Sequence, residues 1–312
     1  MSELLTPAFV AALVTAALLG AVPVLLAALG ETLSEQSGVL GLGTEGMLLV
    51  GGLASFATVL GTGSFWLGFL AGAVAGAAAA AITAVLCVGL GLNQVVVGLA
   101  VTVGGSGLTS VLYQHWFGET GPRLGAPDGF PLPGLRAIPV VGDALFGQHA
   151  MVPVAAVLVV LIGWWLRRTG PGLRLRVAGQ RPQSLDAAGG SVLRVRAGAV
   201  LAAGVLSGLG GAFLATVTAG TFTPFMTHGL GFIAIVLAML ARGSALGVAL
   251  GALLYGGTVA AGTALQFASG AVPTDVIQML PFALIMLVLL LFSRSQTLPP
   301  ALGTPYVRGS RV

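Results

Sequence analysis

The chain has no lysine, a single cysteine and few charged residues, and each shortage excludes a class of protein. Only 7% of its 312 residues are charged and 56% are hydrophobic, which gives a mean hydropathy of +1.03. Soluble domains carry about 25% charged residues, so this composition could not cover a soluble surface with polar groups. A chain without lysine also cannot build the phosphate-binding loop of a standard P-loop ATPase.

Residues suited to metal or redox chemistry are equally sparse. Cys87 lies inside an apolar run, can form no internal disulfide, and is interpreted as a small core residue. The three histidines are scattered, with no metal-ligand spacing between them. No basic patch is interleaved with aromatic residues, so we expect no nucleic-acid partner. The sequence predicts neither catalytic residues nor a metal site.

Long apolar runs take up most of the chain. Apolar runs of about 20 residues cross the roughly 30 Å of a bilayer as helices, so the sequence predicts an all-α, polytopic protein with about 8–10 transmembrane helices. The N-terminus lacks a basic stretch and predicts a retained span rather than a signal peptide. Segment 39–60 is interrupted by glycines and 229–241 is short, so either could be broken or re-entrant. The nine segments are 7–29, 39–60, 65–90, 94–113, 150–167, 196–216, 229–241, 244–263 and 274–293.

Arginine placement predicts the orientation. Basic residues stay on the cytoplasmic side of membrane proteins, and seven of the thirteen arginines lie in the loop over 167–196. That loop and the tail 294–312 are therefore predicted inside, and segment 114–149 outside. Nine full spans place the N-terminus outside, whereas one re-entrant hairpin would place it inside.

A faint internal repeat is visible. "LGFLAGA" (67–73) and "LGVALGA" (246–252) share a pattern, and a "GLG" precedes each copy, at 41–43 and at 229–231. Duplicated halves with broken helices are common in transporters. Small residues spaced by three also pack helices generally, so duplication and chance both stay open.

Glu45 is the one acidic residue between residues 40 and 113, within "GLGTEG" (41–46). The stretch matches a dinucleotide-binding pattern, but no β-strand precedes it and a membrane span follows it, which excludes that function. The glycines fit close helix packing or a helix break. Glu45 either faces a substrate path or lies at the membrane edge.

Other polar residues within the apolar segments are also candidates for a substrate path. Asn93 either caps the helix that follows it or points into a pore together with Gln94. Ser106 bonds its own backbone or makes one helix face polar. The segment 216–229, "TVTAGTFTPFMTHG", contains Phe222 and Thr223, and forms either the mouth of a path or an interfacial loop.

A short cytoplasmic helix is predicted within 173–200. Pro182 suits the first turn of a helix, "PQSLDAA" continues it, and Gly189-Gly190 ends it. A stiff exposed helix between two spans can dock into a groove on another protein. The alternative is a plain surface loop that obeys the charge rule for cytoplasmic segments.

Four segments together resemble a known family. "ALGETLSEQSGVLGLGTEGMLL", "LNQVVVGLAVTVGGSGLTSVL", "VAGQRPQSLDAAGGSVLRVR" and "GLGFIAIVLAMLARGSALGVALGALLYG" are similar, in order over about residues 22–293, to permease subunits of bacterial ABC importers. The resemblance is to the branched-chain amino-acid/simple-sugar superfamily, in its nucleoside/ribose-like branch. It implies one permease domain over 1–312, with N-terminal helices (7–113), an extracytoplasmic loop (114–149), C-terminal helices (150–293), a coupling loop (167–195) and a cytoplasmic tail (294–312).

The resemblance also implies partners and roles. The chain would be a non-enzymatic, multi-pass subunit in the bacterial plasma membrane, without a cofactor of its own. It would pair with a related permease as a heterodimer, with a cytoplasmic ATPase that holds ATP and magnesium, and with a substrate-binding lipoprotein outside. The coupling helix that docks on the ATPase would include Gln180, Arg181, Pro182, Ser184, Asp186 and Ala187. The family often has "GENPxAAxxAG" here, so Gln180, Arg181 and Ser184-Leu185 depart from its pattern.

The predicted function is therefore ATP-driven import of nucleosides by alternating access. The substrate path is predicted near Glu45, Asn93 and Gln94, with Ser106, Phe222 and Thr223 as further candidates. Simple sugars or branched-chain amino acids are the alternative substrates. An ion-coupled carrier or a channel is the alternative class, although such carriers usually hold several acidic residues or histidines within the membrane.

Overall fold

The computed structural model describes residues 7–118, 120–127, 129, 147–269, 274–292 and 298–307. Every regular element in this part of the chain is a helix, which confirms the all-α prediction. The elements are α1 (Pro7–Ser37), α2 (Thr44–Thr62), α3 (Phe65–Thr83) with the π-helical extension η2 (Ala84–Gly89), α4 (Gln94–Phe117), α6 (Met151–Arg168), α7 (Gly170–Gln180), α8 (Pro182–Ala187), α9 (Val192–Phe213) with the extension η4 (Leu214–Thr218), α10 (Leu230–Ala241), α11 (Ala245–Ser269) and α12 (Thr274–Phe292).

Each of the nine predicted apolar segments corresponds to a helix. Within the described residues, seven helices are long and apolar enough to cross a membrane. Of the other two apolar helices, α10 is shorter (Leu230–Ala241), and α12 (Thr274–Phe292) has its side chains described without a gap over Met279–Val288. Twelve residues of α10 span only about 18 Å, so α10 alone cannot cross the hydrocarbon layer. The chain is a multi-pass membrane protein with one half-length helix.

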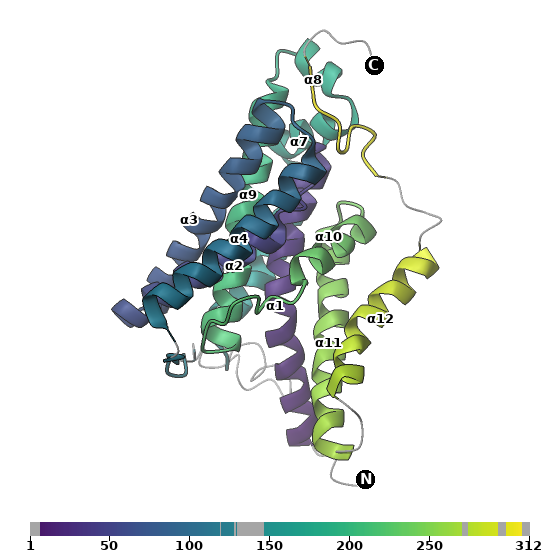
Figure 1. The fold of residues 1–312 in the computed structure, drawn as a ribbon. Coiled ribbons are helices and arrows are strands. Elements are labelled where there is room, and N and C mark those ends of the chain that lie inside the picture. The colour runs from purple at the N-terminus through teal and green to yellow at the C-terminus, as the bar shows by residue number, and fades with distance from the viewer. Residues whose placement is uncertain are drawn as a thin grey trace.

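Helix α1 forms the centre of the bundle (Figure 1). It packs against α9, α10 and α11, and every residue from 21 to 39 is buried. The predicted end of this segment at residue 29 is wrong, because the helix continues through "GETLSEQS" to Ser37. Polar residues are tolerated here because they face protein rather than lipid.

The two ends of the bundle are chemically distinct. The beginning of α1 lies at the opposite end from α7 and α8, which carry the arginine-rich loop (Figure 1). Gly38, just past α1, approaches Gly179 at the end of α7. With the arginine-rich loop on the cytoplasmic side, as the sequence predicts, α1 would start on the extracytoplasmic side. That orientation corresponds to the alternative that places the N-terminus outside, which stays a prediction.

Helix packing supports an internal duplication of opposite orientation. Helices α1 and α9 run antiparallel, with Gly30 opposite Ala203 and Gly210 opposite Pro23. Helix α9 packs on α2 and α3 just as α1 packs on α10 and α11. Helices α1–α4 thus correspond in order to α9–α12, and the first helix of each set packs on the second and third helices of the other set. Transporters with inverted repeats have this kind of arrangement.

Glycines bring α9 into backbone contact with its neighbours. A Cβ atom on Gly208 would meet the carbonyl oxygen of Gly72 and, at 3.0 Å, the Cα atom of Gly76 in α3. A Cβ atom on Gly51 of α2 would lie 2.5 Å from the Cα atom of Gly208. Small residues let membrane helices approach this closely and gain van der Waals contact.

Substitution of Gly208 tests this packing. Gly208→Ala should destabilise the protein by about 1–3 kcal/mol, because the methyl group has no room. Gly198 of the same helix is the matched control, since an added Cβ atom meets nothing within 4 Å, and Gly198→Ala should be neutral or slightly stabilising. Thermal unfolding in detergent measures both, and equal melting temperatures for the two variants would contradict the packing.

Candidate translocation and coupling sites

Glu45 joins the first turns of two helices inside the bundle. Its side chain is only 7% exposed. Oε1 accepts hydrogen bonds from Thr227 Oγ1 at 2.6 Å and from the Gly229 amide at 2.8 Å, and Oε2 accepts one from the Gly231 amide at 2.6 Å. The contact is tight, because a Cβ atom on Gly231 would lie 2.6 Å from the Cα atom of Glu45. The carboxylate of α2 therefore caps α10.

The physical reason lies in the start of α10. The first amides of a helix have no partner within the helix, and the residue before α10 is Gly229, which has no side chain to cap them. Gly229 adopts φ +86, a left-handed conformation that favours glycine. Glu45 supplies the missing acceptor from another helix. It also lies in the first turn of α2, so its negative charge is stabilised by two helix dipoles.

A second carboxylate, Glu31 of α1, holds the loop that leads into α2. Its Oε1 accepts a hydrogen bond from the Gly41 amide at 2.8 Å, and its Oε2 accepts one from Thr44 Oγ1 at 3.3 Å. Gly41 is required here, because a Cβ atom would overlap the Glu31 carboxylate. The stretch 41–46 is thus hydrogen-bonded to Glu31 at its start. At its end, Glu45 is hydrogen-bonded to α10 and to the loop before it. We call this arrangement the Glu45 junction.

Glu35, one turn after Glu31, contrasts with both carboxylates. It is 1% exposed, and neither carboxylate oxygen accepts a hydrogen bond within the described part of the chain. Burying an unpaired carboxylate costs free energy. Burial of Glu35 therefore lowers the stability of the fold, whereas the hydrogen bonds of Glu45 raise it.

Helix α4 holds the same loop from the other side. Gln94 Oε1 accepts a hydrogen bond from the Leu40 amide at 2.8 Å, and Thr102 Oγ1 donates one to the Leu42 carbonyl at 2.8 Å. The structure thus brings Gln94 and Glu45 to the two ends of one loop. Ser106 donates to the Thr102 carbonyl at 2.8 Å, as expected for a hydroxyl that bonds its own helix.

Asn93 is confirmed as a helix cap. Its Oδ1 accepts hydrogen bonds from the amides of Val95 and Val96, at 2.9 and 3.3 Å. Asn93 is exposed at the start of α4, whereas the neighbouring Gln94 is buried at 3% exposure. The two amides, predicted together, therefore have different surroundings.

The segment before α10 enters the bundle in part. Phe222 is fully buried and its ring lies 5.6 Å from that of Tyr113, whereas Thr223 is exposed. Phe225 and His228 have positive φ angles of 62 and 44. Such angles are uncommon for residues with side chains and are found at turns and strained sites. Thr227, which donates to Glu45, was missed by sequence reasoning, although it lies two residues before the second "GLG".

The Glu45 junction should determine stability. Glu45→Ala removes three charge-assisted hydrogen bonds and should cost about 3 kcal/mol or more. Glu35→Gln is the matched control, because it alters a carboxyl group without hydrogen-bond partners and should be neutral or stabilising. Thermal unfolding in detergent measures both variants. The account of the junction fails if Glu45→Ala is as stable as Glu35→Gln.

The predicted coupling helix has one buried and one exposed face. Helix α8 is anchored by Pro182 and Leu185, which are buried, while Gln183, Ser184 and Ala187 are exposed. Gln180 and Arg181 are exposed at its beginning and Asp186 is partly exposed. The predicted helix and its end at Gly189, with φ +78, are confirmed. Helix α7, which leads into α8, was not predicted.

An aromatic cluster surrounds His149 just before the start of α6. The imidazole lies 5.7 Å from the rings of Phe65 and Trp66 and 5.2 Å from that of Phe69. Its Nδ1 accepts a hydrogen bond from the Met151 amide at 3.2 Å. Burial lowers the pKa of His149, because it disfavours the charged imidazolium.

Acid should weaken this end of the protein. The unfolded chain takes up a proton at the ordinary value of 6.5, but the folded chain does so only at lower pH. The contribution of His149 is therefore complete above pH 6.5 and declines as the pH falls below it. Melting temperature measured against pH should show this decline, and His149→Gln should reduce it. An identical pH profile for the variant would exclude His149 as its source.

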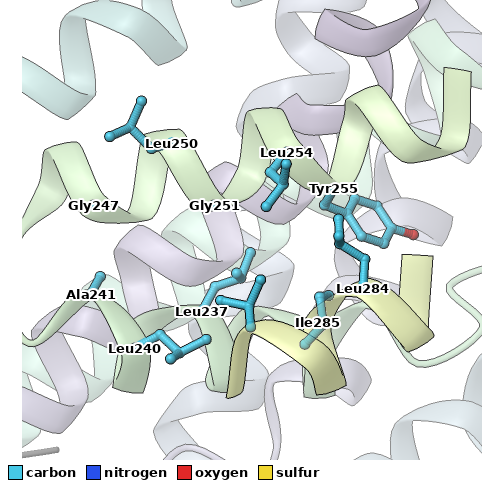
Figure 2. A pocket seen from close by; sticks show the side chains of 11 residues that line it. Leu237, Leu240, Ala241, Gly247, Leu250, Gly251, Leu254, Tyr255, Leu284 and Ile285 are labelled. Carbon is cyan, nitrogen blue, oxygen red and sulfur yellow. The ribbon is translucent and has the colours of Figure 1, made fainter. Parts of the chain in front are cut away.

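Two apolar cavities lie between helices, one beside α10 and the other beside α2. One of ≈ 550 Å³ lies between α10, α11 and α12 (Figure 2), where leucines from α10 and α11 surround it and Tyr255 is the one polar side chain in its lining. The other, of ≈ 460 Å³, lies between α2, α3 and α4, the matching helices of the first set. Polar ligands need several placed polar groups, so both cavities suit hydrocarbon rather than a polar substrate.

The fold and its sites define a class. Apolar spans, two sets of helices that pack in matching ways, a half-length helix that starts inside the bundle and an anchored short helix in the arginine-rich segment are features of a transport permease. The family described as "Branched-chain amino acid transport system / permease component" matches residues 11–289. The chain belongs to this family of ABC transporter permeases. Proteins of this family are translocation components rather than enzymes, and the chain is a multi-pass plasma-membrane protein.

Three curated relatives are similar to the chain. NupQ of Bacillus subtilis, a guanosine ABC transporter permease protein, is 32% identical over 96% of this chain and 97% of its own. NupC of Lactococcus lactis, a nucleoside ABC transporter permease protein, is 30% identical over 92% and 93%. TsgC13 of Haloferax volcanii, provisionally described as a glucose ABC transporter permease protein, is 38% identical over 80% and 76%. No solved structure matches the chain significantly.

Proposed function

We propose that the chain is the membrane-spanning subunit of an importer for nucleosides, driven by a separate ATPase. The substrate class is supported by the two nucleoside permeases, which are similar over almost the whole of this chain. Sugars are the second candidate, because the relative described for glucose has a higher sequence identity to this chain, although over a smaller share of its length.

The single observation that carries the coupling role is the exposed face of α8. Pro182 and Leu185 fix the helix to the bundle, so a force on its exposed face moves the protein rather than only the loop. ATP and magnesium would be held by the ATPase and not by this chain. A second, related permease and an extracytoplasmic lipoprotein that delivers the substrate complete the proposed assembly.

The substrate path is proposed to run near the Glu45 junction. Glu45 already accepts three hydrogen bonds, out of about four that a carboxylate can accept. Its proposed role is therefore to hold α2 and α10 together beside the path, rather than to bind substrate. Gln94 would act in the same way through Leu40. Alternating access would then change the position of this junction relative to the rest of the bundle.

Reconstitution tests the function directly. The permease pair, its ATPase and its lipoprotein are placed in liposomes, and uptake of labelled guanosine and glucose is measured. Uptake should require ATP and persist without a proton gradient, and guanosine should be preferred. Uptake that continues without ATP and stops when the proton gradient collapses would overturn the importer proposal. Preference for glucose would establish the second candidate.

The docking role of α8 has a sharper test. Ala187→Trp adds bulk to the exposed face of α8 and should abolish capture of the ATPase and ATP-dependent uptake, while the permease remains folded. Ala126→Trp is the matched control, because Ala126 is exposed in the segment on the opposite side of the membrane. Normal capture by Ala187→Trp would contradict docking at this face.

A further inference from the structure

A segment near the C-terminus returns to the cytoplasmic end of the bundle and contacts the helices that meet there. The Ala301 amide donates a hydrogen bond to the Gly179 carbonyl at 3.1 Å, and the Gly303 amide donates one to the Gly38 carbonyl at 3.2 Å. Gly179 belongs to α7, and Gly38 directly follows α1. Residues 298–307 thus bridge the end of the central helix and the helix that leads into α8, at the arginine-rich end of the bundle (Figure 1). This segment lies beyond residues 11–289, which the family matches.

Glycine is needed where these segments meet. Gly38 has φ +94, and an added Cβ atom would lie 2.8 Å from Arg196 Nη2 and 3.2 Å from the Ala301 carbonyl oxygen. On Gly179 an added Cβ atom would overlap the backbone of Gln36. The backbones of Gly38, Gly179 and Ala301 therefore approach one another closely where α1, α7 and the C-terminal segment meet.

Arg196, at the start of α9, fixes this meeting point. It is 2% exposed, and burial of such a charge requires hydrogen-bond partners. Its Nη1 donates to the Thr304 carbonyl at 2.8 Å, and its Nη2 donates to the Ala178 carbonyl at 3.3 Å. One guanidinium group therefore ties the C-terminal segment to α7 and α9.

The far end of the segment reaches α8 itself. Tyr306 packs against a small core made of Ala178, Leu185 and Val192, which belong to α7, α8 and α9. It also lines a hollow of ≈ 290 Å³ beside Asp186. One end of this ten-residue segment thus contacts α8, and the middle of the segment contacts the end of α1.

We propose that residues 298–307 form a strap that transmits movement of α8 to α1, and through α1 to the Glu45 junction. The proposal rests on the proposed function, in which an ATPase displaces α8. Backbone hydrogen bonds and the Arg196 contacts make the strap, α7 and the end of α1 move as one body. Glu31 lies two turns before the end of α1 and holds the Gly41 loop, so movement of α1 displaces the junction.

Removal of the strap separates docking from transmission. The reconstituted complex is made with the full chain and with a chain ending at residue 297, and three quantities are measured: ATPase capture, ATP hydrolysis and substrate uptake. The truncated chain should capture the ATPase and hydrolyse ATP, while substrate transported per ATP falls about tenfold. Simple destabilisation would instead lower hydrolysis and uptake together, leaving their ratio unchanged, and that result overturns the proposal.

A smaller change guards against misfolding of the truncated chain. Tyr306→Ala leaves the chain at full length but removes the side chain that packs the strap on Ala178, Leu185 and Val192, and it should also lower the ratio of transport to hydrolysis. Val307→Ala is the matched control, since Val307 is the next residue and is 61% exposed; its ratio should match that of the full chain. An unchanged ratio in Tyr306→Ala overturns the strap, as does loss of ATPase capture, which would make the segment a docking surface. Failure of the unmodified complex to capture ATPase would instead reject the importer function.

Discussion

The structure depends on one buried carboxylate that joins two helix ends far apart in the sequence. Glu45 of α2 accepts hydrogen bonds from Thr227, Gly229 and Gly231, and so supplies an acceptor for the amides of Gly229 and Gly231 at the start of α10. A helix that begins within a bundle must find such an acceptor, because no water is at hand to replace it. The carboxylate of α2 therefore holds the start of the half-length helix and the end of the loop that precedes it.

The junction is connected to the cytoplasmic end by α1. This central helix holds the Gly41 loop through Glu31 and ends at Gly38, where α7 and the C-terminal segment meet it. The inverted repeat places α1 and α9 back to back, so the two sets of helices share one core. Packed backbone and hydrogen bonds thus run continuously from α8 to the start of α10, and the proposed coupling of ATP use to transport would use this route.

Local patterns predicted much of this fold from the sequence. Nine apolar segments, the short helix from Pro182 and the cap at Asn93 follow from neighbouring residues, and all are present. The partner of Glu45 could not be predicted in this way, because Thr227 lies 182 residues away. Helix α1 extends past its predicted end since burial by other helices compensates for its polar residues. Sequence favoured neither interpretation of Glu45, and the structure shows a buried cap rather than a residue at the membrane edge.

Hydrogen exchange at the start of α10 tests the central claim most directly. In the unmodified protein the amides of Gly229 and Gly231 donate to Glu45, so a peptide covering them should exchange slowly, although the helix itself offers these amides no acceptor. Protection should be lost when Glu45 can no longer accept, while amides in the middle of α9 keep theirs. Rapid exchange at Gly229 and Gly231 in the unmodified protein would contradict the account, because the carboxylate would then not cap α10.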